Sequence, residues 1–307
     1  MTTSRERERT VPAQDPAGAD RGLDWAVVWF FVIAYALAWG IWGLETLLAD
    51  NVGMATGDFI NAIEDGNFDT ITSGTPSWLL YLMTRVQDFS FTIAGLIMIS
   101  VTAGAAGWRQ LWKRLTKWRI PLRWYLLALL PVALYAAAAV IANSSEDGDL
   151  AFDSSTVSTI LFSLSAGLLV SLFLRGAMGE ELGLRGFALP RLQQRTTPSR
   201  AALIIGVAWG VWHIPAFLDR DVVTVVVLVM LIIGLSYIFT WLFNGSGGSL
   251  IPPLLFHATQ NWEEAFETVF PAIIDTDWET PAALALLVLG IVAAIKVTRG
   301  GKGARHE

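Results

Sequence analysis

Residues 222–243 read VVTVVVLVMLIIGLSYIFTWLF and contain no Asp, Glu, Lys, Arg or His. This uninterrupted apolar stretch has the length of roughly 20 residues that a helix needs to cross the hydrocarbon layer of a bilayer. The stretch therefore predicts a transmembrane helix. Its length and apolar composition are the standard against which the other segments of the chain are compared.

Seven further segments are apolar enough to suggest spans, so the sequence predicts an all-α, polytopic transmembrane bundle of about eight spans. The composition agrees, because 54% of the 307 residues are hydrophobic and 16% are charged, against roughly 25% charged in soluble domains. With the stretch quoted above, the predicted spans are 25–48, 78–104, 124–141, 160–189, 201–217, 222–243, 250–270 and 282–297.

The charges of the connecting loops alternate as eight spans require, because Lys and Arg accumulate on the cytoplasmic side of membrane proteins. Segment 50–75 has five acidic residues and no basic one, whereas 109–123 has six basic residues and no acidic one. The alternation continues through the acidic loop 146–153 to the basic C-terminal end. We therefore expect an integral, multi-pass protein of the cell (plasma) membrane with both termini in the cytoplasm.

The expected organisation is one membrane domain with two cytoplasmic tails. Residues 1–22, rich in Arg, Glu, Pro and Ala, are typical of a disordered tail. The bundle then occupies 23–298, and 299–307 forms a second tail.

Charge and cysteine content narrow the function classes. The net charge is −6, which argues against a nucleic-acid partner. The chain has no Cys, so disulfides, thiolate nucleophiles and Cys-based metal sites are excluded.

Ionisable residues inside the predicted spans are the main functional signal, since each costs about 2.5 to 3.5 kcal/mol at mid-helix on insertion scales and usually lines a functional site. Glu180 and Glu181 lie in span 160–189, His213 at the end of 201–217, and His257 in 250–270. Measured from basic or polar residues expected at the inner surface, Glu180, His213 and His257 lie at similar depths, roughly 18 to 22 Å along each helix.

Helical spacing assigns faces to these residues. Glu181 and Arg185 are i and i+4 and can form an ion pair, whereas Glu180 points about 100° away. His257 and Asn261 share a face for the same reason. The sequence therefore predicts that a carboxylate, two imidazoles and an amide converge from three helices.

Two other polar features have plainer interpretations. Arg85 and Asp88, i and i+3 in span 78–104, are expected to form a packing ion pair. The Trp- and Lys/Arg-rich stretch 108–123 fits either an interfacial amphipathic helix or a positive-inside loop with aromatic anchors.

The three motifs resemble the CPBP (ABI, CAAX-protease-like) family of membrane proteins, which includes the type II CAAX prenyl endopeptidases. The family pattern E-E-x-x-x-R is present at 180–185, an aromatic-x-x-x-H motif at 209–213 and H-x-x-x-N at 257–261. The resemblance covers about 108–264, and its specificity comes from three motifs in order, each in its own span.

The resemblance implies an intramembrane endopeptidase acting on a membrane-associated peptide or protein, including prenylated, CAAX-like ones. Carried over residue by residue, Glu180 would activate water with help from His213. His257 and Asn261 would stabilise the oxyanion, while Glu181 and Arg185 would hold the glutamate in place. The substrate itself and the lipid bilayer are the only partners that this predicts.

Whether a metal takes part stays open at this point. Glu180, His213 and His257 match the ligand types of a catalytic zinc site with one open position. The chain lacks H-E-x-x-H, however, and a metal-free glutamate mechanism is also argued for relatives. We favour chemistry without a metal.

Two other functions compete with proteolysis. The first is a non-catalytic immunity or scaffold protein of the same family, in which the constellation is structural. The second is a proton-coupled or small-molecule transporter, since buried acids and histidines also relay protons; against it, the two halves of the chain show no matching broken helices.

Overall fold

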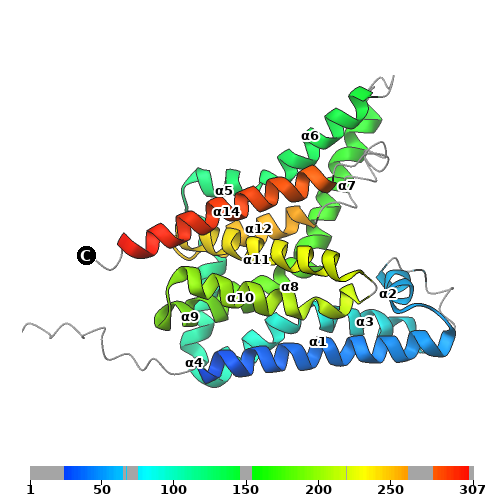
Figure 1. Ribbon diagram of the computed structural model, residues 1–307, viewed down its shortest axis with the longest axis horizontal. Helices are drawn as coiled ribbons and strands as arrows, with labels where there is room; N and C mark the ends of the chain where they lie inside the picture. Colours follow the sequence, from blue (N-terminus) through cyan, green and yellow to red (C-terminus); the bar gives the residue numbers. More distant parts are fainter. Residues whose placement is uncertain are drawn as a thin grey trace, which may run out of the picture.

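The computed structural model describes residues 24–64, 67, 75–145, 154–218, 220–261 and 279–303, and this part of the chain is helical without strands (Figure 1). The all-α prediction is therefore confirmed for these residues. The helices are α1 (Trp25–Val52), α2 (Thr56–Glu64), α3 (Ser77–Asp88), α4 (Ser90–Leu115), α5 (Leu122–Ala128), α6 (Leu130–Ser145), α7 (Ser154–Phe173), α8 (Gly176–Gly183), α9 (Leu189–Arg195), α10 (Pro198–Trp212), α11 (Val222–Gly245), α12 (Ile251–Gln260) and α14 (Glu279–Gly303), with a π-helix η3 (Leu184–Ala188) and a 3-10 helix η4 (Ile214–Phe217).

Within the described residues, three helices are long and apolar enough to cross a membrane: α1, α4 and α11. Large apolar side chains on them face outward; Val222 and Val223 of α11, for example, are 78% and 72% exposed. Exposed apolar area of this kind is a liability in water and suits contact with lipid. Both observations support a membrane protein, whereas the number of eight spans stays a prediction.

Several predicted spans are not single helices. Span 160–189 is divided into α7, α8 and η3, because Arg175 adopts an extended backbone (φ −113°, ψ −179°) between the first two. Span 78–104 divides at Phe89 into α3 and α4, and 124–141 divides at Leu129 into α5 and α6. Residues 262–270 of the seventh span lie outside the described residues, as do tail residues 1–22.

The stretch 108–123 combines the two interpretations that its sequence allowed. Its first part continues α4 to Leu115, beyond a non-helical Gly104 (φ 48°, ψ −139°). Residues 116–121 are not helical, and α5 then begins at Leu122.

The π-helix η3 has a local cause in Pro190. A proline at this position has no N–H for the carbonyl of Gly186, and its ring would clash with that carbonyl in a regular α-helix. The chain widens instead, with Leu189 N–H donating to the Leu184 carbonyl. The Gly186 carbonyl accepts a hydrogen bond of 2.7 Å from Arg114 Nη1 of α4, which satisfies the group that proline leaves without a partner.

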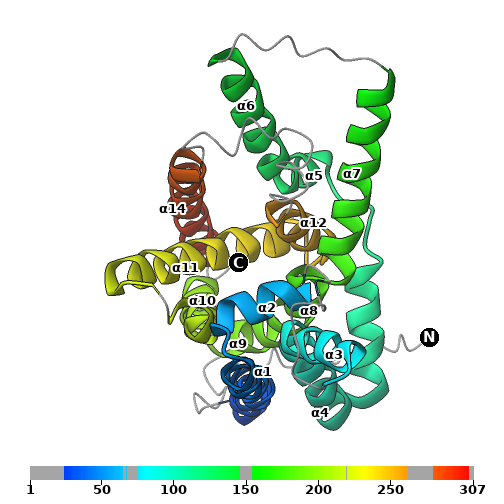
Figure 2. The same ribbon diagram turned by 90° about the vertical axis from the view of Figure 1, so that its right-hand side faces the viewer.

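Helix α8 lies inside the bundle and packs against α4, α7 and α12 (Figures 1 and 2). Two of its glycines allow the backbone of the α3–α4 region to approach closely. A Cβ at Gly179 would lie 2.4 Å from the Asp88 carbonyl oxygen, and one at Gly183 would lie 2.1 Å from that of Phe91. Contacts this short with backbone atoms exclude any larger residue, so these glycines set the position of α8.

The first and last described helices have their outer ends on the same side of the molecule. The first described turn of α1 and the last turn of α14 both lie at the left of Figure 1. Helix α14 continues to Gly303, past the predicted start of the C-terminal tail at 299.

Gly183→Ala tests the close packing of α8. We expect it to destabilise the fold by about 1 to 3 kcal/mol or more, as overpacking of a filled interior does. The matched control is Gly43→Ala in α1, where a Cβ would have no atom within 4 Å; we expect it to be neutral or stabilising by up to about 1 kcal/mol. The measurement is thermal unfolding of each purified variant in detergent. Equal midpoints for the two variants would contradict the packing described here.

Candidate active site

Helix α8 carries both motif glutamates into the interior, where Glu180 is 5% exposed and Glu181 is fully buried. The N-terminal half of this short helix is held by side chains from α3 and α4. Arg85 donates to the Leu174 carbonyl at the break that precedes α8, and Thr92 Oγ1 donates to the Met178 carbonyl over 2.6 Å. The predicted Arg85–Asp88 ion pair is also present, at 3.1 Å.

Glu181 and Arg185 form the ion pair that their spacing predicts. Arg185 Nη1 lies 2.9 Å from Glu181 Oε1, and both side chains are completely buried. A buried pair of charges is stable only with good geometry and further polar partners, because desolvation of each ion is costly. Glu181 has a further polar partner of this kind in His257.

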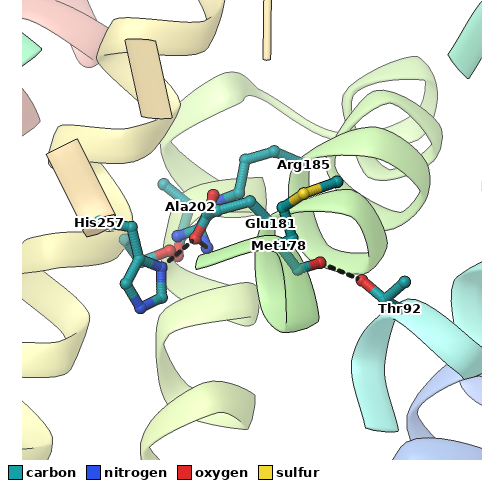
Figure 3. A network of polar contacts seen from close by, with 7 residues as sticks. Thr92, Met178, Glu181, Arg185, Ala202 and His257 are labelled. Atoms are coloured by element: carbon teal, nitrogen blue, oxygen red, sulfur yellow. Dashed lines mark hydrogen bonds and ion pairs between the residues drawn. The ribbon is translucent and has the colours of Figure 1, made fainter. Parts of the chain in front are cut away.

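His257 of α12 binds the same carboxylate oxygen. Its Nδ1 lies 3.0 Å from Glu181 Oε1 (Figure 3). A carboxylate can only accept here, so Nδ1 carries the proton and Nε2 is left as the second functional nitrogen. The sequence assigned Glu181 to holding the neighbouring glutamate; in the structure it joins Arg185 to His257, which the sequence did not predict.

Two aromatic rings hold the cation and the imidazole in place. The Arg185 guanidinium lies 5.0 Å from the ring centre of Trp209 and 4.6 Å from that of Phe239. The His257 ring also stacks on Phe239, with centroids 5.4 Å apart and planes at 16°. Trp209 belongs to the aromatic-x-x-x-H motif, but Phe239 lies within the uniformly apolar α11, where no sequence signal distinguishes it.

Glu180 and His257 both approach the backbone of Gly176 closely. An ideal Cβ built on Gly176 would lie 2.5 Å from Glu180 Oε1 and 3.1 Å from His257 Nε2, so both atoms border the position where any other residue would place a side chain. Glu180 Oε2 is buried without a hydrogen-bond partner among the described residues, and the same is true of Trp209 Nε1, which is directed at this carboxylate. Unpaired buried polar atoms require an explanation, and they are common where a reacting group binds.

His213 ends α10 as its C-cap, next to the aromatic cluster. Its Nδ1 lies 2.9 Å from the Trp209 carbonyl oxygen, so Nδ1 is the protonated nitrogen and Nε2 has a free lone pair. The Trp209 ring contacts both imidazoles, at centroid distances of 5.8 Å to His213 and 5.7 Å to His257. The structure thus places both histidines around one indole.

Asn261 lies one turn beyond His257, as its spacing predicts. It is the C-cap of α12 and is partly buried, and its backbone N–H donates to the His257 carbonyl over 3.1 Å. The position of Asn261 is therefore set by the end of α12 and not by a contact with the buried Glu181–Arg185 ion pair.

Comparison with known proteins identifies this part of the chain. Residues 156–262 match the family described as type II CAAX prenyl endopeptidase Rce1-like. The CAAX prenyl protease 2 of Methanococcus maripaludis is 29% identical in an alignment of 108 positions that covers 31% of this chain and 40% of the relative. Because residues 156–262 are similar to this family, we call them the CAAX-protease-like region. The chain covers well under two thirds of the length of that relative.

The CAAX-protease-like region contains all six candidate residues, Glu180, Glu181, Arg185, His213, His257 and Asn261. The side chains that hold α8 and η3 from outside, among them Arg85, Thr92 and Arg114, precede this region in the chain. The site of the CAAX-protease-like region therefore depends on α3 and α4 for its position.

The zinc arrangement considered above does not fit the geometry. Among the described residues, no three His, Asp or Glu side chains are grouped closely enough to hold a metal ion. The reason is visible in the contacts: His257 directs one nitrogen to Glu181 and the other to the Glu180 side, while His213 lies across Trp209. Glu180, His213 and His257 thus border a common aromatic cluster without enclosing one metal position.

Arg185→Met tests the buried ion pair of the CAAX-protease-like region. The variant leaves the Glu181 carboxylate buried without its cation, so we expect a loss of stability of about 3 to 5 kcal/mol. The control is Arg191→Met, which removes a partly exposed arginine 3.5 Å from Asp24 and should cost less than about 1 kcal/mol. Unfolding of both variants in the same detergent gives the comparison, and similar losses would argue against a special role for the buried pair.

Proposed function

We propose that this protein is an intramembrane endopeptidase that hydrolyses a peptide bond in a membrane-associated protein, with prenylated, CAAX-like C-termini as the expected substrate class. The comparisons support the CAAX-type protease class, and the apolar helices support a membrane location. The observation that carries the proposal is that Glu180, a buried glutamate with one oxygen unpaired among the described residues, lies beside Gly176 together with the second nitrogen of an imidazole that another carboxylate holds.

In this mechanism Glu180 takes a proton from water as the water oxygen attacks the scissile carbonyl carbon. Because Oε2 of Glu180 has no competing partner among the described residues, the carboxylate is available as a general base. His213, whose Nε2 has a free lone pair, assists in orienting and deprotonating the water. The proton then passes to the leaving amine as the carbon–nitrogen bond breaks.

The tetrahedral intermediate carries a negative oxygen that requires hydrogen-bond donors. His257 can donate from Nε2 once this nitrogen is protonated, because Glu181 on the opposite side of the ring compensates the imidazolium charge. Asn261, one turn further along α12, contributes its amide. In surroundings with little water these contacts are worth more than they would be in solution.

The chain is proposed to cross the membrane an even number of times, about eight. Both termini then lie in the cytoplasm. This orientation is supported by the common location of the start of α1 and the end of α14 (Figure 1). Arg191 and Arg195 lie 3.5 Å and 3.6 Å from Asp24 at this end of the molecule, which agrees with a basic cytoplasmic face.

Glu180→Gln tests the proposed base. The amide keeps the shape of the side chain but cannot take a proton, so we expect cleavage of a membrane-tethered, farnesylated reporter peptide to fall by about 10²- to 10⁴-fold. The measurement is the cleavage rate of the purified protein in vesicles, with the unfolding midpoint recorded in parallel.

The control for that experiment is Glu45→Gln in α1, which neutralises another fully buried glutamate and should leave the rate within a fewfold of the unchanged protein. Undiminished cleavage by Glu180→Gln would refute the role of Glu180, and a stable protein without any cleavage of tethered reporters would favour the non-catalytic scaffold function.

A strong chelator should leave the rate of cleavage unchanged. Loss of activity with restoration by zinc would refute the metal-free mechanism.

A further inference from the structure

One cavity of the bundle is lined by three basic side chains, and no acidic residue is among its described lining residues. The cavity has a volume of about 410 Å³ and lies between the end of α4, the start of α9 and the turn after α11. We call it the basic cavity; its walls include Lys113, Arg114, Lys117, Gln193, Gly247 and Gly248.

No Asp or Glu lines the basic cavity among the described residues, although the chain as a whole is acidic. Lys113 makes no hydrogen bond or ion pair with any described residue, so its charge is available to a ligand. A second cavity of about 180 Å³ adjoins the first, shares Gln110 and Arg114 with it, and adds Arg191. An anion that enters the basic cavity would meet Lys113, Arg114 and Lys117 without an acidic lining residue, whereas Arg191 of the second cavity already lies 3.5 Å from Asp24.

The walls are held in place by hydrogen bonds to the backbone. Lys117 Nζ donates to the Gly247 carbonyl over 2.7 Å, in a turn where Gly247 and Gly248 have left-handed φ angles of 69° and 83°. Arg114 Nη1 donates to the Gly186 carbonyl, also over 2.7 Å. Arg114 and Lys117 are therefore anchored to the backbone of the fold, whereas Lys113 is exposed and its charge is held by no such bond.

The surroundings of the basic cavity suit the membrane–water boundary. Trp112 and Trp118, on either side of the basic segment, are 66% and 62% exposed, and exposed tryptophans are typical of the headgroup level of a bilayer. The end of α4 and helix α9 lie at the same end of the molecule as the start of α1 (Figure 1), which is the predicted cytoplasmic end. Basic pockets between helices on this side of a membrane are suited to anionic headgroups.

We propose that the basic cavity binds the phosphate of an anionic phospholipid headgroup from the inner leaflet, with Lys113 and Lys117 as its main contacts. The site is separate from the candidate active site but connected to it through Arg114. The Arg114 carbonyl accepts from Leu250 N–H over 3.0 Å, directly before the helix that carries His257, and its guanidinium binds η3. The lipid would therefore stabilise the segment on which both catalytic helices depend.

The test is lipid retention by the full chain, purified in a neutral detergent and observed by native mass spectrometry. Phosphatidylglycerol and phosphatidylcholine with the same acyl chains are added separately. We expect the unchanged protein to retain phosphatidylglycerol preferentially. Lys113→Gln and Lys117→Gln should each weaken this retention by about fivefold, and the double variant by more, since each lysine near an anionic headgroup contributes a comparable amount.

The matched control is Arg109→Gln, which removes a positive charge from the same helix at an exposed position that does not line the basic cavity. Retention by this variant should equal that of the unchanged protein. Equal retention by the double lysine variant would overturn the proposal, and so would an equal loss in Arg109→Gln, because general surface charge would then explain the binding.

Two further measurements distinguish a phospholipid headgroup from inorganic phosphate and from a peptide carboxylate as the ligand of the basic cavity. If inorganic phosphate binds in a lysine-dependent manner while phosphatidylglycerol does not, the lipid assignment is overturned. The same holds if the lysine variants retain the lipid but lose affinity for a peptide with a free C-terminal carboxylate. Lysine-dependent retention of phosphatidylglycerol, with or without competition by phosphate, supports the assignment.

Discussion

One carboxylate oxygen, Oε1 of Glu181, is the contact on which the candidate site depends. It accepts from Arg185 within its own helical segment and from His257 on a different helix, at 2.9 Å and 3.0 Å. Burial of an ionised carboxylate costs free energy that partners of this kind offset. The need to satisfy this charge therefore ties α8 to α12 and determines which nitrogen of His257 is left for chemistry. Glu180, one residue earlier, remains free of this pair and faces the other side of the imidazole.

A second constraint is that backbone carbonyls need hydrogen-bond donors where helices break inside the bundle. The interruption before α8 and the π-helix after it leave carbonyls at Leu174 and Gly186 that regular helices would satisfy. Arg85 and Arg114 bind them from α3 and α4. Since both arginines precede the CAAX-protease-like region, this region and the N-terminal helices act as one structural unit around the site.

Much of the site could be predicted from the sequence because its signals are local. The i, i+4 spacing of Glu181 and Arg185 predicted their ion pair, and the rarity of charge in apolar spans singled out Glu180 and His257. Contacts between distant segments could not be predicted in the same way. The bond between His257 and Glu181 depends on how α12 crosses α8, and the stacking of Phe239 depends on which face of α11 is turned inward.

For the fold as well, features with a local sequence signal could be predicted, whereas features that depend on contacts between distant segments could not. The uniform apolarity of α11 predicted one long helix, and the structure has it from Val222 to Gly245. The break at Arg175 was not predicted, because hydropathy continues across it and the arginine from α3 that binds the Leu174 carbonyl is far away in the sequence. The π-helix before Pro190 had a local signal in the proline itself, but its consequence depended on Arg114 as a partner for the freed carbonyl.

The most direct test of the central claim is a double-mutant cycle of unfolding free energy between Glu181 and His257. Glu181→Gln keeps the shape of the side chain, and His257→Phe keeps a ring that can stack on Phe239 while removing Nδ1. If the carboxylate holds the imidazole as described, the two changes together should cost less than the sum of their separate effects, with a coupling of about 1.5 to 3 kcal/mol. Additive effects, within about 0.5 kcal/mol, would contradict the account.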